Sequence, residues 1–159
     1  MLLLNIPPDT KGLVNESDVK ALQGWKRLRD ETFNTNLAKN AIVKATSGKN
    51  VKNMLDSNYN TFWTSSAKDT TASIEFDLKG TKTFDVLSIQ ENIKIGQRIE
   101  QFVLEYWNGS EWKKATEGTT VGYKRLLRFA PVTANKVRLR ILSARLNPTI
   151  SEMGLYKQP

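Results

Sequence analysis

The residues best suited to chemistry lie in one short stretch, between Asn53 and Trp63. This stretch places one carboxylate, Asp56, among several amide and hydroxyl oxygens. Oxygen donors of this kind are the ligands that a hard cation such as Ca²⁺ prefers. The same composition is also typical of a plain Asx-rich turn that holds no metal. The local sequence leaves both interpretations open.

An EF-hand can be excluded for this stretch. The spacing of Asp56, Asn58 and Asn60 matches the start of an EF-hand loop, but the sixth position is Thr61 instead of glycine and the twelfth is Ala67 instead of glutamate. A cation bound here would therefore need backbone carbonyls and a second carboxylate from a distant part of the chain.

Catalysis by this chain is not expected. Histidine, the commonest general base, is absent, and no glycine-rich phosphate loop is present. Five acidic residues lie on or near predicted strands, but no motif pairs them as the two carboxyl groups of a glycosidase: Asp77, Asp85, Glu91, Glu100 and Glu105.

Composition indicates one sizeable domain with a basic surface. The chain has 159 residues, no cysteine and a formal net charge of +8. The basic surplus could suit nucleic acid or acidic glycans, but it is spread along the chain and accompanies no motif that reads DNA or RNA. We therefore interpret it as solvated surface and expect no nucleic-acid partner. No apolar run reaches 18 residues, so no membrane-spanning segment is predicted.

The N-terminal part differs from the rest. The apolar run from Leu2 to Pro8 is typical of a strand buried in a parallel sheet, and later residues offer it no parallel partner. A helix is predicted from Glu16 to Phe33, because a stripe of apolar residues recurs at helical spacing and Asn15 or Ser17 can cap its start. Residues 34–38 are interpreted as a linker.

Short alternating segments follow and predict an antiparallel β-sandwich or barrel. The predicted strands cover residues 41–46, 72–78, 84–89, 102–107, 121–129, 137–141 and 149–156, with a bulge in 84–89. Asn108-Gly109 predicts a hairpin, and a three-residue turn there would pair Tyr106 with Trp112 in the core. We also expect Trp63 in the core, and Trp107 and Tyr123 at the surface.

Two blocks carry a resemblance to known families. The block Leu2-Leu3-Leu4-Asn5-Ile6-Pro7-Pro8-Asp9, with the helix start at Gly12 to Leu22, resembles the last strand and helix of the catalytic barrel of bacterial α-L-fucosidases. From Ala38 onward, the run Leu55-Asp56-Ser57-Asn58 and Thr61-Phe62-Trp63-Thr64-Ser65 is similar to discoidin (coagulation-factor type C, galactose-binding-like) domains. Further support comes from Glu91, Gly96 to Ile99, Val137 to Leu139 and Ile150 to Glu152.

These resemblances imply an all-β fold, an eight-stranded antiparallel jelly-roll sandwich with an N-terminal helix. Residues 1–37 would be the remnant of the barrel, and residues 38–159 the discoidin-like carbohydrate-binding domain. A structural calcium is implied, and its ligands would fall on Asn53, Asp56, Asn58, Thr61, Ser151 and Glu152. Glu152 would supply the distant second carboxylate.

The resemblance also implies a site for glycans, fucosylated or galactosylated, in loops at one end of the sandwich. The candidate contacts are Glu91, Asn92, Gln97, Arg98 and Asn147. Thr64 stands where galactose-reading members often have a histidine. Each candidate also has a structural alternative; Gln97 and Arg98 could simply cap a strand.

We expect a non-catalytic carbohydrate-binding module of an α-L-fucosidase, a retaining glycoside hydrolase, exported to the periplasm, the cell surface or the medium of a bacterium. The alternative is a structural domain that packs on the parent catalytic barrel near its active-site mouth without sugar affinity of its own. Membrane-lipid binding ranks last, because Ile93 and Ile95 are the only candidate apolar loop spikes.

Overall fold

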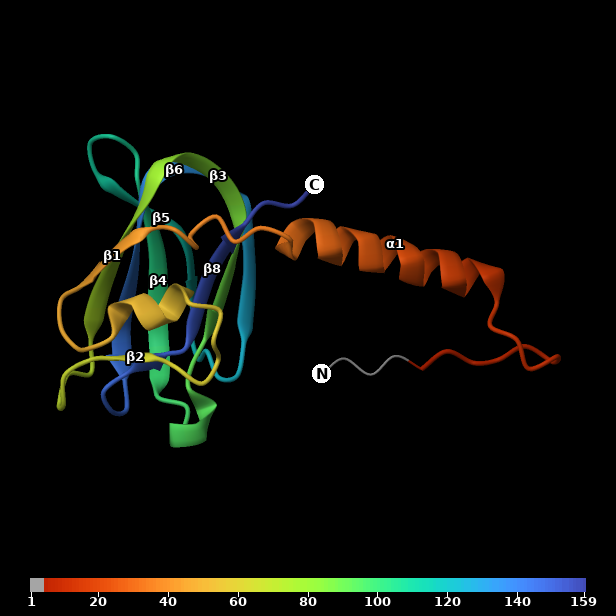
Figure 1. The fold of residues 1–159 in the computed structure, drawn as a ribbon, viewed down its shortest axis with the longest axis horizontal. Coiled ribbons are helices and arrows are strands. Elements are labelled where there is room, and N and C mark those ends of the chain that lie inside the picture. The colour runs from red at the N-terminus through yellow and green to blue at the C-terminus, as the bar shows by residue number, and fades with distance from the viewer. Residues whose placement is uncertain (1–4) are drawn as a thin grey trace.

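Alternating apolar residues build an antiparallel sandwich from which a single helix projects (Figure 1). The computed structural model describes residues 5–159. Its elements are, in chain order, α1 (Glu16–Phe33), β1 (Ile42–Ala45), the 3-10 helix η1 (Val51–Leu55), β2 (Trp63–Thr64), β3 (Ala72–Gln90), the 3-10 helix η2 (Ile93–Ile95), β4 (Ile99–Trp107), β5 (Trp112–Gly118), β6 (Arg125–Ala144), β7 (Thr149–Ile150) and β8 (Glu152–Tyr156).

Two long strands, β3 and β6, pass through both layers of the sandwich. In one layer, the C-terminal part of β3 pairs with the N-terminal part of β6 and with β8. In the other layer, the N-terminal part of β3 and the C-terminal part of β6 pair within the order β1-β3-β6-β4-β5. The sequence predicted two separate strands in each of these regions. The chain instead continues through the bend, where the register shifts between Asp77 and Lys82 and where Lys79 and Gly80 adopt positive φ values of 54° and 136°. The bulge predicted in 84–89 is confirmed by a second register shift, between Phe84 and Val86.

The core lies between the two layers and contains the largest apolar side chains. Phe76 and Phe84 from β3, Phe102 from β4 and Leu139 from β6 are at most 1% exposed. Trp63 is fully buried, as predicted, and its indole Nε1 donates to the carbonyl of Ser47 at 3.2 Å. This hydrogen bond satisfies the one polar atom of the ring.

The hairpin between β4 and β5 has a register that differs from the prediction. Trp107 pairs with Trp112, so the loop contains four residues and Tyr106 lies opposite Lys113. Asn108 Oδ1 closes this loop by accepting from the backbone N–H groups of Ser110 and Glu111, both at 2.9 Å. Trp112 is therefore half-buried instead of in the core.

The rings of the two tryptophans of this hairpin pack against each other. Their ring centroids lie 5.5 Å apart in an edge-to-face arrangement, and the Arg138 guanidinium lies 4.4 Å from the Trp112 ring centroid. Edge-to-face packing and a cation–π contact favour this register over the one that buries Trp112.

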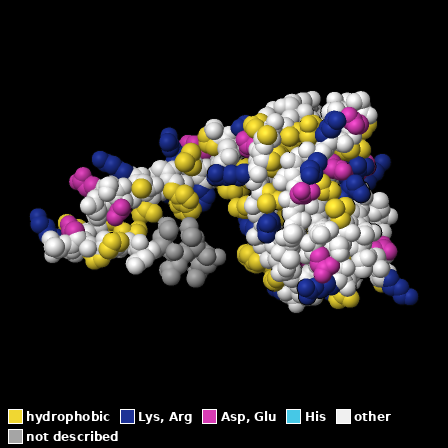
Figure 2. Space-filling model, turned by 180° about the vertical axis from the view of Figure 1, so that it is seen from behind, with side chains coloured by type: hydrophobic (Ala, Val, Ile, Leu, Met, Phe, Trp, Pro, Cys, Tyr) yellow, Lys and Arg dark blue, Asp and Glu magenta, His cyan; other side chains and the backbone are white. Residues whose placement is uncertain are grey.

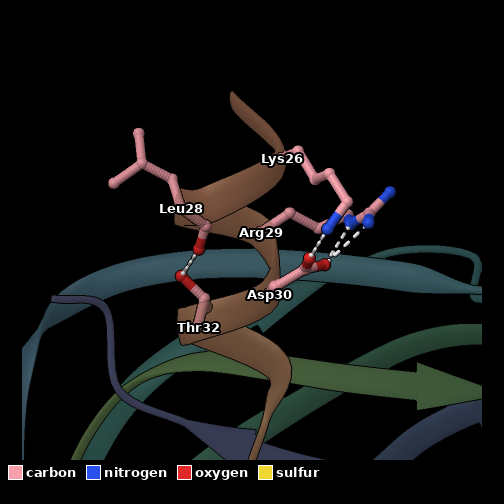
Figure 3. A network of polar contacts seen from close by, with 5 residues as sticks. All are labelled: Lys26, Leu28, Arg29, Asp30 and Thr32. Carbon is pink, nitrogen blue, oxygen red and sulfur yellow. Dashed lines mark hydrogen bonds and ion pairs between the residues drawn. The ribbon is translucent and has the colours of Figure 1, made fainter. Parts of the chain in front are cut away.

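Helix α1 has the predicted bounds, and Asn15 caps it by accepting from the Ser17 N–H at 2.9 Å. Figure 3 shows its last turns. The Asp30 carboxylate forms ion pairs with Lys26 Nζ at 2.7 Å and Arg29 Nη2 at 2.6 Å, while the Thr32 hydroxyl donates to the Leu28 carbonyl. The apolar stripe remains largely in solvent. Its exposed fractions are 37% at Val19, 45% at Trp25, 50% at Leu28 and 36% at Phe33. Figure 2 shows hydrophobic side chains along one side of this arm and where it meets the sandwich.

The segment after α1 is fastened to the edge of β8. Asn36 donates from Nδ2 to the Met153 carbonyl at 3.1 Å, and its Oδ1 accepts from the Leu155 N–H at 3.1 Å. The Leu37 N–H donates to the Leu155 carbonyl at 2.9 Å. Asn36 thus supplies both a donor and an acceptor to an otherwise open strand edge. Residues 34–38 were interpreted as a linker, and part of this segment makes strand-like contacts.

The predicted N-terminal strand lies partly outside the described residues, because it includes Leu2, Leu3 and Leu4. Within the described part, Pro8 and Val14 form an isolated antiparallel bridge. Among the described helices, none is long and apolar enough to cross a bilayer.

Candidate functional site

The loop after η1 brings oxygen atoms of Asp56, Asn58 and Thr61 together. The Thr61 hydroxyl lies 2.6 Å from Asp56 Oδ2 and 2.9 Å from the Asn58 carbonyl oxygen. The other carboxylate oxygen of Asp56 accepts from the Asn58 N–H at 2.8 Å. One hydroxyl proton can serve only one of the two oxygens near it. The cluster therefore has more acceptors than protons to share among them.

Glu152, at the start of β8, completes this cluster from a distant part of the chain. Burial, and the negative charge of the neighbouring Asp56 carboxylate, raise the pKa of Glu152 to about 7. Its Oε1 is buried and has no hydrogen-bond partner. Two neighbouring carboxylates, one with a buried oxygen that lacks a hydrogen-bond partner, form an arrangement that a divalent cation would neutralise.

The remaining predicted calcium ligands lie beside this cluster. Asn53 belongs to η1, one turn before Asp56, and its side-chain amide donates weakly to the Phe62 carbonyl at 3.4 Å. Ser151 is fully buried, and its hydroxyl has no partner. No group of three or more His, Cys, Asp or Glu suited to a metal is found in residues 5–159. A cation at this place would thus take most of its ligands from neutral oxygens, which Ca²⁺ accepts.

Glu91 occupies a different position from the one predicted for a sugar contact. It is 0% exposed, and its Oε1 accepts from the N–H groups of Arg98 at 2.7 Å and Ile99 at 2.9 Å. Its Oε2 accepts from the Gly122 N–H at 2.8 Å. These bonds fasten residues 91–99 to the loop before β6. The geometry assigns Glu91 to holding two loops together and removes its carboxylate from the surface.

Asn92 is also turned inward. It is 4% exposed, and its Oδ1 accepts from the Lys94 N–H at 3.3 Å, which caps η2. The geometry thus favours a capping role for Asn92 over the predicted contact with a ligand. Gln97 is exposed in the same loop, where its side chain lies against Gly122.

Arg98 and Asn147, two further predicted contacts, form one network with Thr64. Arg98 Nη1 donates to both the main-chain oxygen and the Oδ1 of Asn147, at 2.8 and 2.9 Å. Asn147 Nδ2 donates to the Thr64 hydroxyl at 2.9 Å. The three residues come from three separate segments at the loop end of the sandwich, where η2 forms the lowest point of Figure 1. Predicted residues from distant parts of the chain therefore converge.

The structure adds residues beside Gln97 and Arg98 that the sequence did not single out as ligand contacts. A hollow of about 230 Å³ beside Arg98 is lined by Gln97, Arg98, Ile99, Glu100, Thr120 and Arg145. Glu100 accepts from the Ser143 hydroxyl at 2.8 Å and from Arg145 at 3.0 Å, and these two bonds lower the pKa of its carboxyl group. Spacing gave no signal for this hollow, because Thr120 and Arg145 are remote in the sequence from residues 97–100.

Aromatic and aliphatic side chains surround the same loop end. Tyr123, which is 61% exposed, lies 5.2 Å from the Tyr59 ring, centroid to centroid. Ile93, Ile95 and Leu146 are 39%, 43% and 59% exposed. Exposed apolar surface next to hydrogen-bonding groups is typical of ligand-binding sites.

A second concave surface lies between α1 and the layer formed by the C-terminal part of β3, the N-terminal part of β6 and β8. It has a volume of about 630 Å³ and is lined mainly by Trp25, Leu28, Phe33, Val86, Leu126 and Arg128. This groove joins the exposed stripe of the helix to apolar side chains on the outer face of β3 and β6.

The family of the chain follows from comparison with known proteins. The model of the F5/8 type C domain matches residues 32–153. The chain belongs to the F5/8 type C domain family. This membership confirms the predicted discoidin domain, and it supports a non-catalytic role.

Relatives of this F5/8 type C chain are fucosidases. Alpha-L-fucosidase 1 of Arabidopsis thaliana is 36% identical over 98% of this chain, and the putative alpha-L-fucosidase 1 of Oryza sativa is 33% identical over 98%. The matched part makes up 33% and 32% of those proteins. The chain therefore spans about a third of their length.

Solved structures similar to this chain also include fucosidases. A putative α-L-fucosidase from Bacteroides thetaiotaomicron superposes with a TM-score of 0.93 at 38% identity, over 98% of this chain and 36% of that one. A GH29 fucosidase from Ruminococcus gnavus superposes with a TM-score of 0.91 at 35% identity, over 99% and 33%. At this coverage the arm and the sandwich superpose together. A Clostridium perfringens module in complex with GalNAc-β-1,3-galactose shares the fold, with a TM-score of 0.69 at 20% identity over 77% of this chain.

Proposed function

We propose that this F5/8 type C domain is a carbohydrate-binding accessory module of an α-L-fucosidase of the retaining type, stabilised by a structural calcium and exported from the cell. The proposal depends chiefly on the convergence of Arg98, Asn147 and Thr64 at the loop end. Fixed polar groups next to exposed apolar residues suit a sugar, which offers hydroxyls at its edge and C–H groups on its face.

Some residues at the loop end connect the loops to one another, and others are proposed to contact the glycan. Glu91 and Asn92 hold the loops through backbone N–H groups. Gln97, Arg98 and Asn147 remain as the proposed contacts with the glycan, and Thr120 and Arg145 line the adjacent hollow. Arg98 is positioned by Asn147 before any ligand arrives, which reduces the conformational entropy lost on binding.

Calcium has a structural role in this proposal. Asp56, Asn58, Thr61 and Glu152 would hold the ion, with Asn53 and Ser151 nearby, and the orphaned Glu152 Oε1 supports this assignment. The bound ion would supply positive charge that offsets the repulsion between the two carboxylates. These residues would thereby join the loop after η1 to the start of β8.

Binding can be tested by isothermal titration against a panel of fucosylated and galactosylated glycans. We expect saturable binding that Asn147→Ala weakens about tenfold, because Arg98 loses its support and the ligand loses an amide. Lys82→Ala, in the bend of β3 remote from these loops, is the control and should bind as the wild type does. Absence of binding to every glycan of the panel would contradict the proposal.

The groove beside α1 supports a second candidate function. An apolar groove that continues the exposed helix stripe is what a domain packed on a catalytic barrel would present. In this case Leu126→Glu would destabilise the full-length polypeptide, because a charge would enter a buried interface, while the isolated chain would melt unchanged. An equal effect in both forms would contradict this alternative.

A further inference from the structure

The loop end carries a surplus of positive charge that its carboxylates do not neutralise. Loops 46–62, 65–71, 91–98, 119–124 and 145–148 contain seven cations, namely Lys49, Lys52, Lys68, Lys94, Arg98, Lys124 and Arg145. The same loops contain three acids, Asp56, Asp69 and Glu91. Glu100 at the start of β4 and Glu152 at the start of β8 lie against these loops as well, so the formal surplus at the end where the proposed glycan site lies is two positive charges, seven minus five.

The acids at this end are largely occupied by partners of their own. The Glu91 carboxylate is fully buried under three backbone N–H groups. Asp56 is bonded to Asn58 and Thr61 and lies against Glu152. Glu100, at the start of β4, accepts from Ser143 and Arg145. Asp69 is therefore the one acid of these loops whose carboxylate is not occupied by a partner of this kind. The positive charges of these loops outnumber the negative ones.

The cations, in contrast, have mostly neutral partners. Arg98 donates to oxygens of Asn147 and Ile95, and Lys94 Nζ donates to Asn60 Oδ1 at 2.7 Å. Among the described residues, Arg145 is the one of the seven that forms an ion pair. A guanidinium has five N–H donors. Arg98 uses both on Nη1 and one on Nη2, at a long 3.3 Å, which leaves one Nη2 donor and the buried Nε–H without a partner.

The polar groups next to Arg98 form a continuous row. Asn147 connects Arg98 to Thr64, and the backbone of Thr64 pairs with that of Lys49. The row thus runs from the Arg98 guanidinium to the backbone of Lys49. Exposed Ile95 and Leu146 adjoin it in the chain and add apolar surface.

We propose that this loop end selects acidic glycans, in which a carboxylate or sulfate group of the sugar is met by Arg98 and by the surrounding lysines. This inference rests on the proposed carbohydrate binding and specifies its ligand class. Arg98 would form a charge-assisted hydrogen bond to the anionic group, and Lys49 and Lys94 would attract the polymer at longer range. A neutral glycan offers the same hydroxyls but leaves this charge unused.

The test compares two forms of one polymer, polygalacturonate and its methyl ester, in which a methyl group on each carboxyl removes the negative charge and the sugar hydroxyls are unchanged. Binding is measured by isothermal titration at about 20 mM and about 150 mM salt, since added salt screens exposed charges. We expect the acidic form to bind about tenfold more tightly at low salt and to lose part of that advantage at high salt. Equal binding of the two forms at low salt overturns the inference.

Charge variants locate the effect. Arg98→Gln is expected to weaken binding of the acidic polymer about tenfold, and Lys49→Gln and Lys94→Gln about two- to fivefold each. Lys79→Gln and Lys82→Gln, which remove the same charge at the bend of β3, should leave the affinity unchanged. If the two control variants weaken binding as much as the loop variants, only net charge matters and the inference is overturned. The lysine variants keep the test informative if Arg98→Gln fails to fold.

Two further outcomes separate the possible failures. If both polymer forms bind equally well, carbohydrate binding stands and only the preference for acidic glycans fails. If neither these polymers nor the fucosylated and galactosylated panel binds, the proposed function fails as well. Vesicles with an anionic surface serve as a last comparison, and binding to them with equal loss in Arg98→Gln would show a general polyanion site in place of a glycan site.

Discussion

Single side chains decide how the loop end is built, and Glu91 is the clearest example. A buried carboxylate that accepts three backbone N–H groups is stabilising because each bond is charge-assisted, and it positions residues that come from two loops. The residue that looked like a ligand contact in the sequence is thus a support for the residues around it.

Replacing this carboxylate should therefore reduce stability. Glu91→Gln keeps the size of the side chain but turns an amide NH₂ toward at least one backbone N–H group. We expect a loss of about 1–3 kcal/mol in the free energy of unfolding, measured by urea denaturation. Glu117→Gln, at an exposed ion pair with Lys114, should change it by less than about 0.5 kcal/mol. Similar losses in both variants would contradict the role assigned to Glu91.

Glu152 makes the stability of the protein depend on pH and on divalent ions. Its folded-state pKa is raised to about 7, so its contribution to stability is present below the unfolded pKa and is lost as the pH rises through about 7 when no cation is bound. A cation that needs the ionised carboxylate has the opposite preference.

Calcium should accordingly raise the melting temperature more at pH 8 than at pH 5.5, relative to the same buffers with a chelator. The measurement is a thermal melt by circular dichroism, and a cation that binds only the folded form shifts the midpoint upward. In Glu152→Gln the calcium effect should be small at both pH values. A calcium shift of the same size at pH 5.5 and pH 8, or no shift at all, would contradict the assigned site.

At the level of elements, the junction between α1 and the sandwich is held by few groups. Asn36 bonds to both Met153 and Leu155 on the edge of β8, and Phe33 packs edge-to-face on Tyr156 with ring centroids 4.9 Å apart. Gly154 allows this arrangement, since a Cβ there would lie 2.6 Å from the Tyr156 ring.

Removing the Asn36 amide should loosen the arm without unfolding the sandwich. We expect Asn36→Ala to cost about 1–2 kcal/mol and to increase the mobility of α1 on the nanosecond timescale. Backbone ¹⁵N relaxation would show lower order parameters in α1, and Asn34→Ala would be the control. Unchanged relaxation in Asn36→Ala would show that the ring contact alone holds the arm.

The elements also show what the sequence could predict. The bounds of α1 followed from its cap and its apolar period, and the alternation of Ile74, Phe76 and Leu78 placed the first half of β3 correctly, because both signals are local. The hairpin register was predicted wrongly, because the side chain of Asn108 closes a four-residue loop and no pattern of apolar residues reports such a bond. The contact of Glu152 with Asp56 came from the resemblance alone, since no local pattern links residues so far apart.

Across the whole molecule, the sandwich has a closed core and the arm does not. The stripe of α1 is exposed, and the contacts of the helix with the sandwich are concentrated in its last turn. An isolated helix of 18 residues is marginally stable in water. We infer that α1 opens independently of the sandwich.

Hydrogen exchange can check this difference. Amides of α1 should exchange orders of magnitude faster than those of β4 and β6, because their opening does not require global unfolding. A chain that begins at Asn34 should melt within a few degrees of the full chain. A large fall in melting temperature on this truncation, or equal protection of α1 and β4, would contradict the inference.

The bonds from Asn36 to β8 also bear on how a captured ligand would be presented. A flexible linker of glycine and serine lets a binding domain take many orientations, and its bound ligand takes them as well. Here Asn36 fastens the segment after α1 to the edge of β8, so the loops proposed to bind a sugar keep one direction relative to the last turn of the helix. A polysaccharide held in those loops would therefore lie at a defined direction and distance from the last turn of α1.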